Sequence, residues 1–415
     1  MAIYYGWWIV LASALTGFYV AGTVFYGFTA FVDPLVEEFG WSYTQVSLAS
    51  SLRGLEMGLF APIVGILVGR LGPRIIMRLG IIIMGFSLVL LGLTHSLIMF
   101  YAAFLLLALG AGGCTSVVVM AVVANWFDKK VGLAMGIAVC GFGASGLLVP
   151  ILVKLIDIFQ WRETFIILGL IAWGLGVPLS FVIRDRPEQY GYLPDGISLS
   201  DAGLASEIEK NDKEISFREA LRDKAFLYIL SVEAIRLLIV GTTVIHVMPY
   251  LNSLGIARST AGLVAAGIPL FSIIGRASFG WLGDVTDKRH VVAGTFVLIS
   301  LGLFAFAYIE HKWLIPVFLL LFAPGYGGGM TMRGTIIREY FGRASFGKLI
   351  GLTMGVASVA GIIGPTLGGL VFDTLGSYYL LWVAYAVLSI FGMLLTLRIE
   401  PYHARSGYSQ SRIDP

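Results

Sequence analysis

The chain is dominated by apolar stretches that carry no charged side chain. Asp, Glu, Lys and Arg are absent from residues 1–32, 79–127, 131–153, 164–183, 237–257, 291–309, 313–332, 349–372 and 374–397. About 20 apolar residues cross a bilayer as a helix, and the second of these stretches is long enough for two such helices. A chain with so many helix-length apolar runs is predicted to be an all-α membrane protein.

Twelve transmembrane helices are expected, because the charge-poor runs and the polar breaks between them alternate along the whole chain. The predicted spans are 6–31, 44–69, 74–93, 98–125, 132–156, 162–183, 223–250, 259–283, 290–309, 313–340, 347–372 and 377–397. Only 13% of the residues are charged, against roughly 25% in soluble domains. The predicted domains are an N-terminal six-helix bundle (1–183), a linker (184–222), a C-terminal six-helix bundle (223–398) and a tail (399–415).

The linker is the one long polar segment, and its composition predicts a solvated tether with a short surface helix from Ser216. Lys and Arg are unevenly distributed over the segments between spans. If both termini lie on one side, that side holds twenty of these residues and the other side holds four. Cytoplasmic loops are enriched in Lys and Arg. We therefore expect a multi-pass membrane protein with both termini in the cytoplasm. A bacterial inner membrane is the expected setting.

The two halves repeat with an offset of 215 residues. The matched pairs are Pro34 and Pro249, Gly40 and Gly255, Gly65 and Gly280, Arg74 and Arg289, Gly110 and Gly325, Gly132 and Gly347, Gly136 and Gly351, and Pro150 and Pro365. Homologous six-helix halves are typical of secondary transporters, whose halves rock about a substrate site near mid-membrane. This pattern predicts two pseudo-symmetric bundles with the site between them.

A motif after the second span of each half resembles one of the major facilitator superfamily, which has a GxLxDRxGRR-like sequence there. The first copy is GILVGRLGPR (65–74) and the second is GWLGDVTDKR (280–289). The second copy keeps the acid as Asp284, whereas Gly69 replaces it in the first. The resemblance covers nearly the whole chain and implies the major facilitator fold. It also implies a gating role for Asp284 and for the basic residues near it in the predicted loops: Arg74, Arg289, Lys129 and Lys130.

Two further motifs resemble the monocarboxylate transporters within that superfamily. Residues 126–146, WFDKKVGLAMGIAVCGFGASG, match a signature of the form YFxKRRxLAxGxAxAGxxxG, and YGWWIV (5–10) is similar to the first-helix signature. The family's helix-eight arginine, which takes the substrate carboxylate, corresponds to Arg276. The sequence departs from relatives at three points. Ser272 stands where animal members have an acid, and neither residues 1–32 nor residues 349–372 contain a lysine. These departures bear on proton coupling, and the last favours a monocarboxylate over a dicarboxylate.

Arg276 is the most informative charged residue, because it lies inside a predicted span. A charge at that depth costs about 2.5–3.5 kcal/mol on insertion scales, and the guanidinium is a planar, permanently charged group suited to a carboxylate. The alternative is an arginine that extends to the membrane surface. From about 7 residues inside the helix, roughly 10 Å, that reach is long. We predict that Arg276 binds substrate.

Other ionisable side chains within the spans come in two pairs with the same spacing. Arg53 and Glu56, and Glu233 and Arg236, are three residues apart and share a helix face. Each pair is either a neutral structural ion pair or a proton-coupling group, because burial raises the pKa of a carboxyl group. In addition, Arg333 is a second anion contact or a partner of Glu233.

Three uncharged or titratable side chains complete the candidate site. Tyr26 and Asn125 are candidate polar contacts for the substrate. His246 is either a hydrogen-bonded structural residue or a proton gate.

The sequence predicts a secondary transporter of a small organic monocarboxylate, coupled to protons. Its expected partners are the anion, the proton and the lipid bilayer, with no nucleic acid, and we expect a monomer. Alternatives are a carrier of a sugar or drug and a membrane receptor without transport. No metal-spaced His/Cys cluster, phosphate-binding GxxxxGK[ST] loop or nucleophile elbow occurs. The chain is therefore expected to be no enzyme and to need no cofactor.

Overall fold

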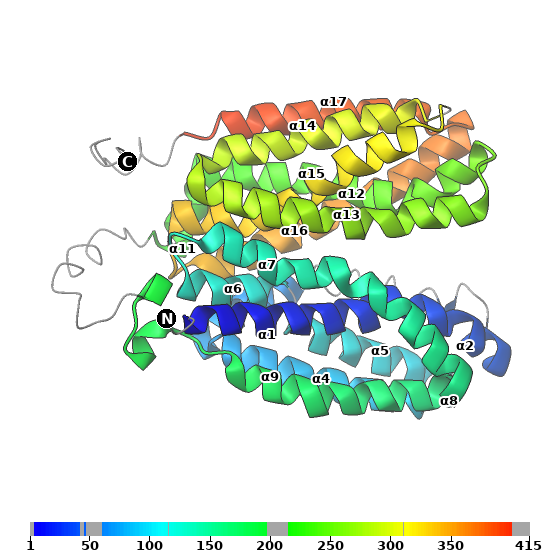
Figure 1. Cartoon of the computed structure of the whole chain (residues 1–415), viewed down its shortest axis with the longest axis horizontal. Coiled ribbons are helices and arrows are strands. Elements are labelled where there is room, and N and C mark those ends of the chain that lie inside the picture. Colours follow the sequence, from blue (N-terminus) through cyan, green and yellow to red (C-terminus); the bar gives the residue numbers. More distant parts are fainter. Residues whose placement is uncertain are drawn as a thin grey trace.

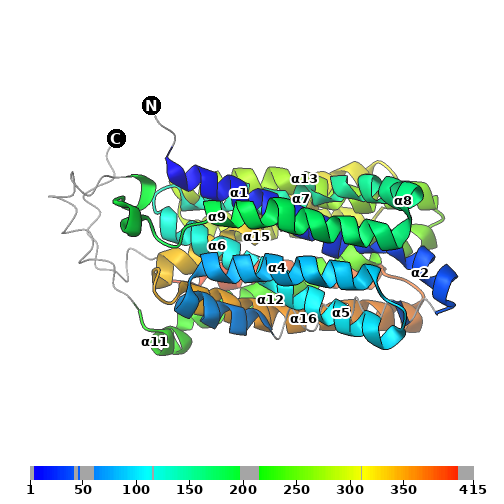
Figure 2. The same cartoon turned by 90° about the horizontal axis from the view of Figure 1, so that it is seen from below.

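The computed structural model describes residues 4–41, 45–46, 60–114, 116–196, 215–309 and 311–400. Two helical bundles lie side by side, one built from each half of the chain (Figure 1). The start of the first helix and the end of the last helix lie at the same end of the molecule, which we call the terminal end (Figure 1). In Figure 2, which is seen from below, the N-terminal bundle lies in front of the C-terminal bundle.

The N-terminal bundle is built from apolar helices of different lengths. They are α1 (Tyr5–Val20), α2 (Val32–Phe39), a helix at Phe60–Leu71, α4 (Pro73–Gly92), α5 (Leu97–Gly112), α6 (Ser116–Trp126), α7 (Val131–Ala144), α8 (Leu148–Ile171) and α9 (Val177–Val182). The chain reverses inside α8, where Gln160 has a φ of 67°. That reversal makes two spans of the apolar stretch Val131–Val182, which is 52 residues long.

The C-terminal bundle consists of six long helices. They are α12 (Lys224–Ser253), α13 (Arg258–Val285), α14 (Lys288–Ala307), α15 (Leu314–Phe341), α16 (Phe346–Leu375) and α17 (Tyr379–Leu397). Within the described residues, ten helical stretches are long and apolar enough to cross a membrane. With the reversal in α8 and the shorter Phe60–Leu71 helix, they account for the twelve predicted spans.

The first span is less regular than predicted. Its α-helix ends at Val20, and the chain continues as a π-helix, η1 (Ala21–Tyr26), and a 3₁₀-helix, η2 (Gly27–Phe31). The π-helical turns carry one of the predicted site residues, Tyr26. Such local rewinding is frequent at functional sites, and apolar composition gave no sign of it.

The described parts of the linker are more structured than the solvated tether that its composition predicts. Residues 184–196 fold against the N-terminal bundle and include two 3₁₀ turns, η5 (Pro187–Tyr190) and η6 (Pro194–Gly196). The predicted surface helix is present as α11 (Phe217–Arg222). Ser216 and Glu219 form a capping box at its start, which satisfies two backbone donors.

The two bundles share one hydrophobic core at the terminal end. That core runs from the N-terminal bundle into the terminal ends of α15 and α16, where it includes Met332, Ile336 and Phe346. A second core, toward the opposite end, is built from residues of the C-terminal half alone. The halves are therefore packed together at the terminal end.

Candidate substrate site

Arg276 lies in the middle of α13, and its side chain is buried between the two bundles. The residue is 1% exposed, so it faces neither lipid nor the membrane surface. Its guanidinium donates a hydrogen bond to the backbone carbonyl of Val139, on α7 of the other half. Its Nε has no hydrogen-bond partner within the described residues. A permanently charged group in this position favours an anion as its missing partner.

Two phenol groups lie close to this guanidinium. The Cζ of Arg276 is 5.8 Å from the centre of the Tyr326 ring on α15, within the range of a cation–π contact. Tyr26, from the π-helix of the N-terminal bundle, is near enough to interact electrostatically with both residues. Aromatic groups from both halves thus surround the charge.

Glu233 and Arg236 form a buried ion pair on α12. The Nη2 of Arg236 is 2.6 Å from an Oε2 oxygen of Glu233, and the two side chains are 2% and 6% exposed. The Nε of Arg333, on α15, lies 3.9 Å from the same carboxylate oxygen. One carboxylate therefore faces two guanidinium groups, and the three side chains together carry a net charge of +1.

Arg333 connects this group to Arg276. It is 3% exposed, donates from Nη1 to the sulfur of Met354 on α16, and interacts electrostatically with Arg276 and Tyr326. The predicted residues Arg276, Arg333, Glu233 and Arg236 thus form one cluster, with Tyr26 at its edge.

Close helix crossings lie on the terminal side of the cluster. A Cβ added at Gly132 of α7 would lie 2.2 Å from the carbonyl oxygen of Gly280 on α13, and one at Gly136 would lie 2.3 Å from that of Arg276. Only glycine permits this approach. The helix at Phe60–Leu71 crosses α16 in the same way, since a Cβ at Gly65 would lie 2.2 Å from the carbonyl oxygen of Gly347.

Asp284 joins the halves at the first of these crossings. Its carboxylate accepts hydrogen bonds from the backbone N–H groups of Gly132 (2.6 Å) and Leu133 (2.8 Å). Both are free donors in the first turn of α7, where the helix dipole favours a negative charge. At the second crossing Gly69 occupies the equivalent position, and a Cβ there would meet only the side chain of Lys348, at 3.8 Å.

The other predicted gating residues also lie at the terminal end. The backbone N–H of Arg74 donates to Asp185 (2.8 Å). The Arg289 guanidinium pairs with Asp287 (2.7 Å) and donates to the carbonyl of Ile399 (2.8 Å). Lys129 and Lys130 have exposed side chains beside the start of α7.

The remaining predicted site residues lie apart from the cluster or outside the described residues. Asn125 donates its amide to the backbone carbonyl of Asp185 (2.9 Å), near the terminal end of α6. Both ring nitrogens of His246 are hydrogen-bonded, to the Tyr378 hydroxyl (3.0 Å) and to a backbone carbonyl of α16 (2.9 Å), an environment that fits the structural alternative. Arg53 and Glu56 are outside the described residues.

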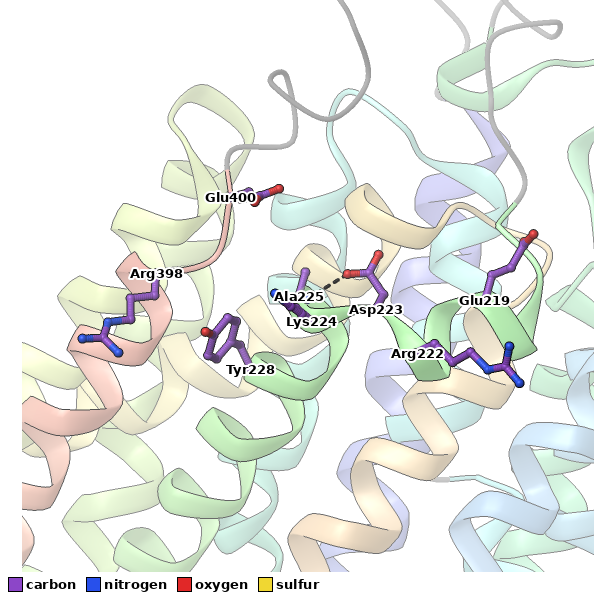
Figure 3. A pocket seen from close by; sticks show the side chains of 8 residues that line it. All are labelled: Glu219, Arg222, Asp223, Lys224, Ala225, Tyr228, Arg398 and Glu400. Atoms are coloured by element: carbon purple, nitrogen blue, oxygen red, sulfur yellow. Dashed lines mark hydrogen bonds between the residues drawn. The ribbon is translucent and has the colours of Figure 1, made fainter.

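A separate pocket of about 570 Å³ opens at the terminal end of the C-terminal bundle. It is lined by Glu219, Arg222, Asp223, Lys224, Ala225, Tyr228, Arg398 and Glu400. Figure 3 shows the two arginines pointing away from each other, and Asp223 is occupied in capping α12. Because its three cations and three carboxylates balance, this pocket offers no preference for an anion.

Sequence reasoning missed Tyr326 and Met354. Tyr326 is seven residues before Arg333 on α15, which is two helical turns, so the two side chains share a face. That spacing was a usable signal. Met354 gave none, because a lone methionine in an apolar helix looks like any other core residue.

The sequence profile described as Major Facilitator Superfamily matches residues 8–245 and 237–412. The chain belongs to the major facilitator superfamily. This membership confirms the predicted fold class and identifies the protein as a multi-pass membrane transporter.

Several major facilitator proteins are similar to this chain over most of its length. An uncharacterized MFS-type transporter of Bacillus subtilis is 25% identical, over 90% of both chains. The oxalate:formate antiporter of Oxalobacter formigenes is 25% identical, over 98% of this chain and 95% of its own length. Monocarboxylate transporter 13 of Rattus norvegicus is 25% identical, over 95% and 89%. These likenesses confirm the resemblance to the monocarboxylate transporter and oxalate–formate branch.

Solved major facilitator structures share the fold at low sequence identity. The proton:xylose symporter XylE superposes with a TM-score of 0.77 at 12% identity, covering 96% of each chain. The human organic anion transporter MFSD10 superposes with a TM-score of 0.72 at 14% identity, covering 94% of this chain and 99% of its own. At such identities the match supports the architecture and leaves the cargo open.

Proposed function

We propose that this protein carries a small organic monocarboxylate across the membrane by rocker-switch alternating access, coupled to protons. The observation that carries the proposal is the position of Arg276. A guanidinium that is 1% exposed, lies between the halves and has an Nε without a partner in the described structure needs a counterion. A carboxylate fits its planar pair of donors.

The rest of the cluster has assigned roles in this proposal. Tyr26 and Tyr326 flank the bound anion, and Arg333 is a second anion contact once it leaves Glu233. Protonation of Glu233 supplies the coupling, because a neutral Glu233 releases Arg236 and Arg333. Glu56 and His246 remain proposed contributors to proton coupling, with Arg53 as the proposed partner of Glu56, and Asn125 remains a proposed contributor to binding.

The terminal end is proposed to be the cytoplasmic side, as the excess of Lys and Arg there favours. In this proposal, the end where the halves pack together is the inner gate in its closed state. Asp284, Arg74, Arg289, Lys129 and Lys130 act at that gate, and the halves separate there when substrate is released inward. The proposed setting is a bacterial inner membrane, with the protein acting as a monomer.

The deciding experiment replaces Arg276 with Gln, which removes the charge and keeps a polar side chain. Purified protein is first screened by thermal shift against lactate, pyruvate, acetate, oxalate and aromatic acids at two pH values, since a bound ligand stabilises the folded state. Counterflow of the stabilising acid is then measured in proteoliposomes. We expect Arg276→Gln to abolish both stabilisation and counterflow. Unchanged counterflow would remove Arg276 from the substrate site. Absence of stabilisation by every acid would favour a sugar or drug carrier, and stabilisation without counterflow in the wild type would favour a receptor.

The coupling role is tested separately with Glu233→Gln. If the carboxyl group carries the coupled proton, this variant retains counterflow, which needs no net proton movement, and loses uptake driven by a pH gradient. Loss of both activities, with the protein still folded, would show that Glu233 is needed for structure or binding and not for coupling.

A further inference from the structure

The first part of the linker is fastened to the N-terminal bundle at both of its ends. We call residues 184–196 the strap. At its start the Asp185 carboxylate caps α4, and the indole of Trp126 donates to the Arg184 carbonyl (2.8 Å). At its end the Asp195 carboxylate accepts from the backbone N–H groups of Asp128 (3.1 Å) and Lys129 (2.7 Å). The strap therefore moves with the N-terminal bundle as one body.

The middle of the strap is held by aromatic groups. The Arg184 guanidinium lies between the rings of Tyr5 (3.9 Å) and Tyr190 (4.0 Å). Tyr4 lies beneath the strap and donates its hydroxyl to the Trp126 carbonyl (2.9 Å). Burial, and then the nearby carboxylates of Asp195 and Glu188, raise the pKa of the Tyr4 phenol, so the hydroxyl stays protonated. These contacts fix the side chains that the strap presents.

One strap side chain reaches the other bundle. Glu188, in η5, accepts a hydrogen bond at 2.7 Å from Nη1 of Arg343, in the turn between α15 and α16. The two side chains are 29% and 20% exposed, so water screens the pair only in part. A second ion pair lies alongside. Arg338, at the end of α15, is 3.4 Å from Asp128 and donates to the Ala124 carbonyl (3.2 Å).

We propose that the strap is a lock on the closed terminal end, with the Glu188–Arg343 ion pair as its bolt. The inference rests on the proposed alternating access and goes beyond it, because it assigns a function to a segment that composition marks as a tether. When the halves separate at the terminal end, Glu188 moves with the N-terminal bundle and Arg343 with the C-terminal bundle. The pair must then break. It stabilises the closed state and contributes nothing to the open one.

The expected size of the effect follows from the exposure of the pair. Partly exposed ion pairs shift an equilibrium by about two- to fivefold. An ion pair of this strength changes the ratio of closed to open states without preventing transport. It also weakens at high ionic strength, because salt screens surface charges.

The test measures opening of the terminal end without any substrate. Met135 of α7 is buried and packs against α15 of the other half. A Met135→Cys reporter is placed in a background with Cys114→Ala and Cys140→Ala, and its labelling rate with a charged maleimide reports the open fraction. We expect Glu188→Gln and Arg343→Gln each to raise the labelling rate about two- to fivefold. The double exchange Glu188→Arg with Arg343→Glu should restore the original rate.

A matched control comes from an ion pair of the same length within one bundle. Arg162 and Glu38 are 2.7 Å apart with 23% and 43% exposed side chains, at the end opposite the termini. Glu38→Gln removes that pair without affecting any contact between the halves, and should leave labelling unchanged. Equal labelling in Glu188→Gln, Arg343→Gln and wild type would overturn the lock, as would failure of the exchanged pair to restore the rate. Because no substrate is present, neither outcome depends on the role of Arg276.

Discussion

The crossing of α7 with α13 and the crossing of Phe60–Leu71 with α16 are the same contact made twice, once on each side of the pseudo-two-fold axis. At each crossing, a Cβ added to a glycine would lie 2.2 Å from a carbonyl oxygen of the facing helix. The first crossing also has the Asp284 carboxylate on the start of α7. The second has Gly69 at the matching position and no carboxylate there.

The two crossings share a close backbone approach and differ in the carboxylate. Close backbone approach is needed at both crossings, because the helices cannot come together without it. We infer that the carboxylate adds stability to a closed state that the glycines already permit. On this inference the terminal end is symmetric in shape and asymmetric in energy.

The largest effect is expected from filling the crossings. Gly132→Val and Gly65→Val each place side-chain atoms where the facing carbonyl oxygen lies, and overpacking of this kind costs about 3 kcal/mol. The closed state should lose about 100-fold in population, seen as faster labelling of the Met135→Cys reporter and as loss of uptake. Similar effects at both positions would support the symmetry in shape. A large effect at one position alone would contradict it.

The next effect tests the energetic asymmetry. Asp284→Ala removes the side-chain cap on the start of α7, and the loss of such a cap costs up to about 2 kcal/mol. Labelling of the reporter should rise by up to about 30-fold. Asp284→Asn keeps one acceptor oxygen and should fall between Ala and wild type. If Asp284→Ala labels at the wild-type rate, the carboxylate contributes nothing to closure.

A smaller effect is expected from adding the missing carboxylate. Gly69→Asp places a carboxylate at the start of α16, beside Lys348, where a helix dipole favours it by about 1 kcal/mol. The reporter should label about fivefold more slowly. Combined with Asp284→Ala, it should recover part of the lost closure. An additional loss in the double variant would show that the two crossings are not interchangeable.

The architecture was predictable because it depends on features that are local in the sequence. The charge-free runs predicted the spans. The 215-residue repeat predicted the two bundles and identified the symmetry-related glycines that lie at the two crossings. Arg276 was identifiable for the same reason, since an arginine within an apolar run is conspicuous without knowledge of its neighbours.

What could not be predicted depends on contacts between distant residues. The hydrogen bond from Asn125 to the Asp185 carbonyl joins residues 60 positions apart, so no local pattern in the sequence indicated it. The strap has the composition of a tether, and its path is fixed by long-range contacts that include capping by Asp185 and Asp195. Likewise the π-helix carrying Tyr26 follows from packing, because nothing in an apolar helix sequence marks the turn that rewinds.

The comparison extends to the helix that follows each crossing, where the smallest effect is expected. The start of α14 is capped by its own preceding residue, Asp287, through the backbone N–H of Arg289 (2.9 Å), whereas α4 is capped by Asp185 of the strap. Burial alone would raise the pKa of Asp287, yet hydrogen bonds from the side chain and backbone of Arg289 hold it below its usual range.

A carboxyl group whose pKa is lowered by folding stabilises the protein above its ordinary pKa. That contribution is lost as the pH falls through the lowered value. Asp287→Asn should therefore lower the melting temperature by about 1 °C at pH 7, and this difference should shrink as the pH falls below the ordinary Asp pKa of about 4. Asp185→Asn should instead raise labelling of the reporter, because it loosens the strap. If both variants changed only the melting temperature, the two caps would be equivalent, and the asymmetry between the halves would end at Asp284.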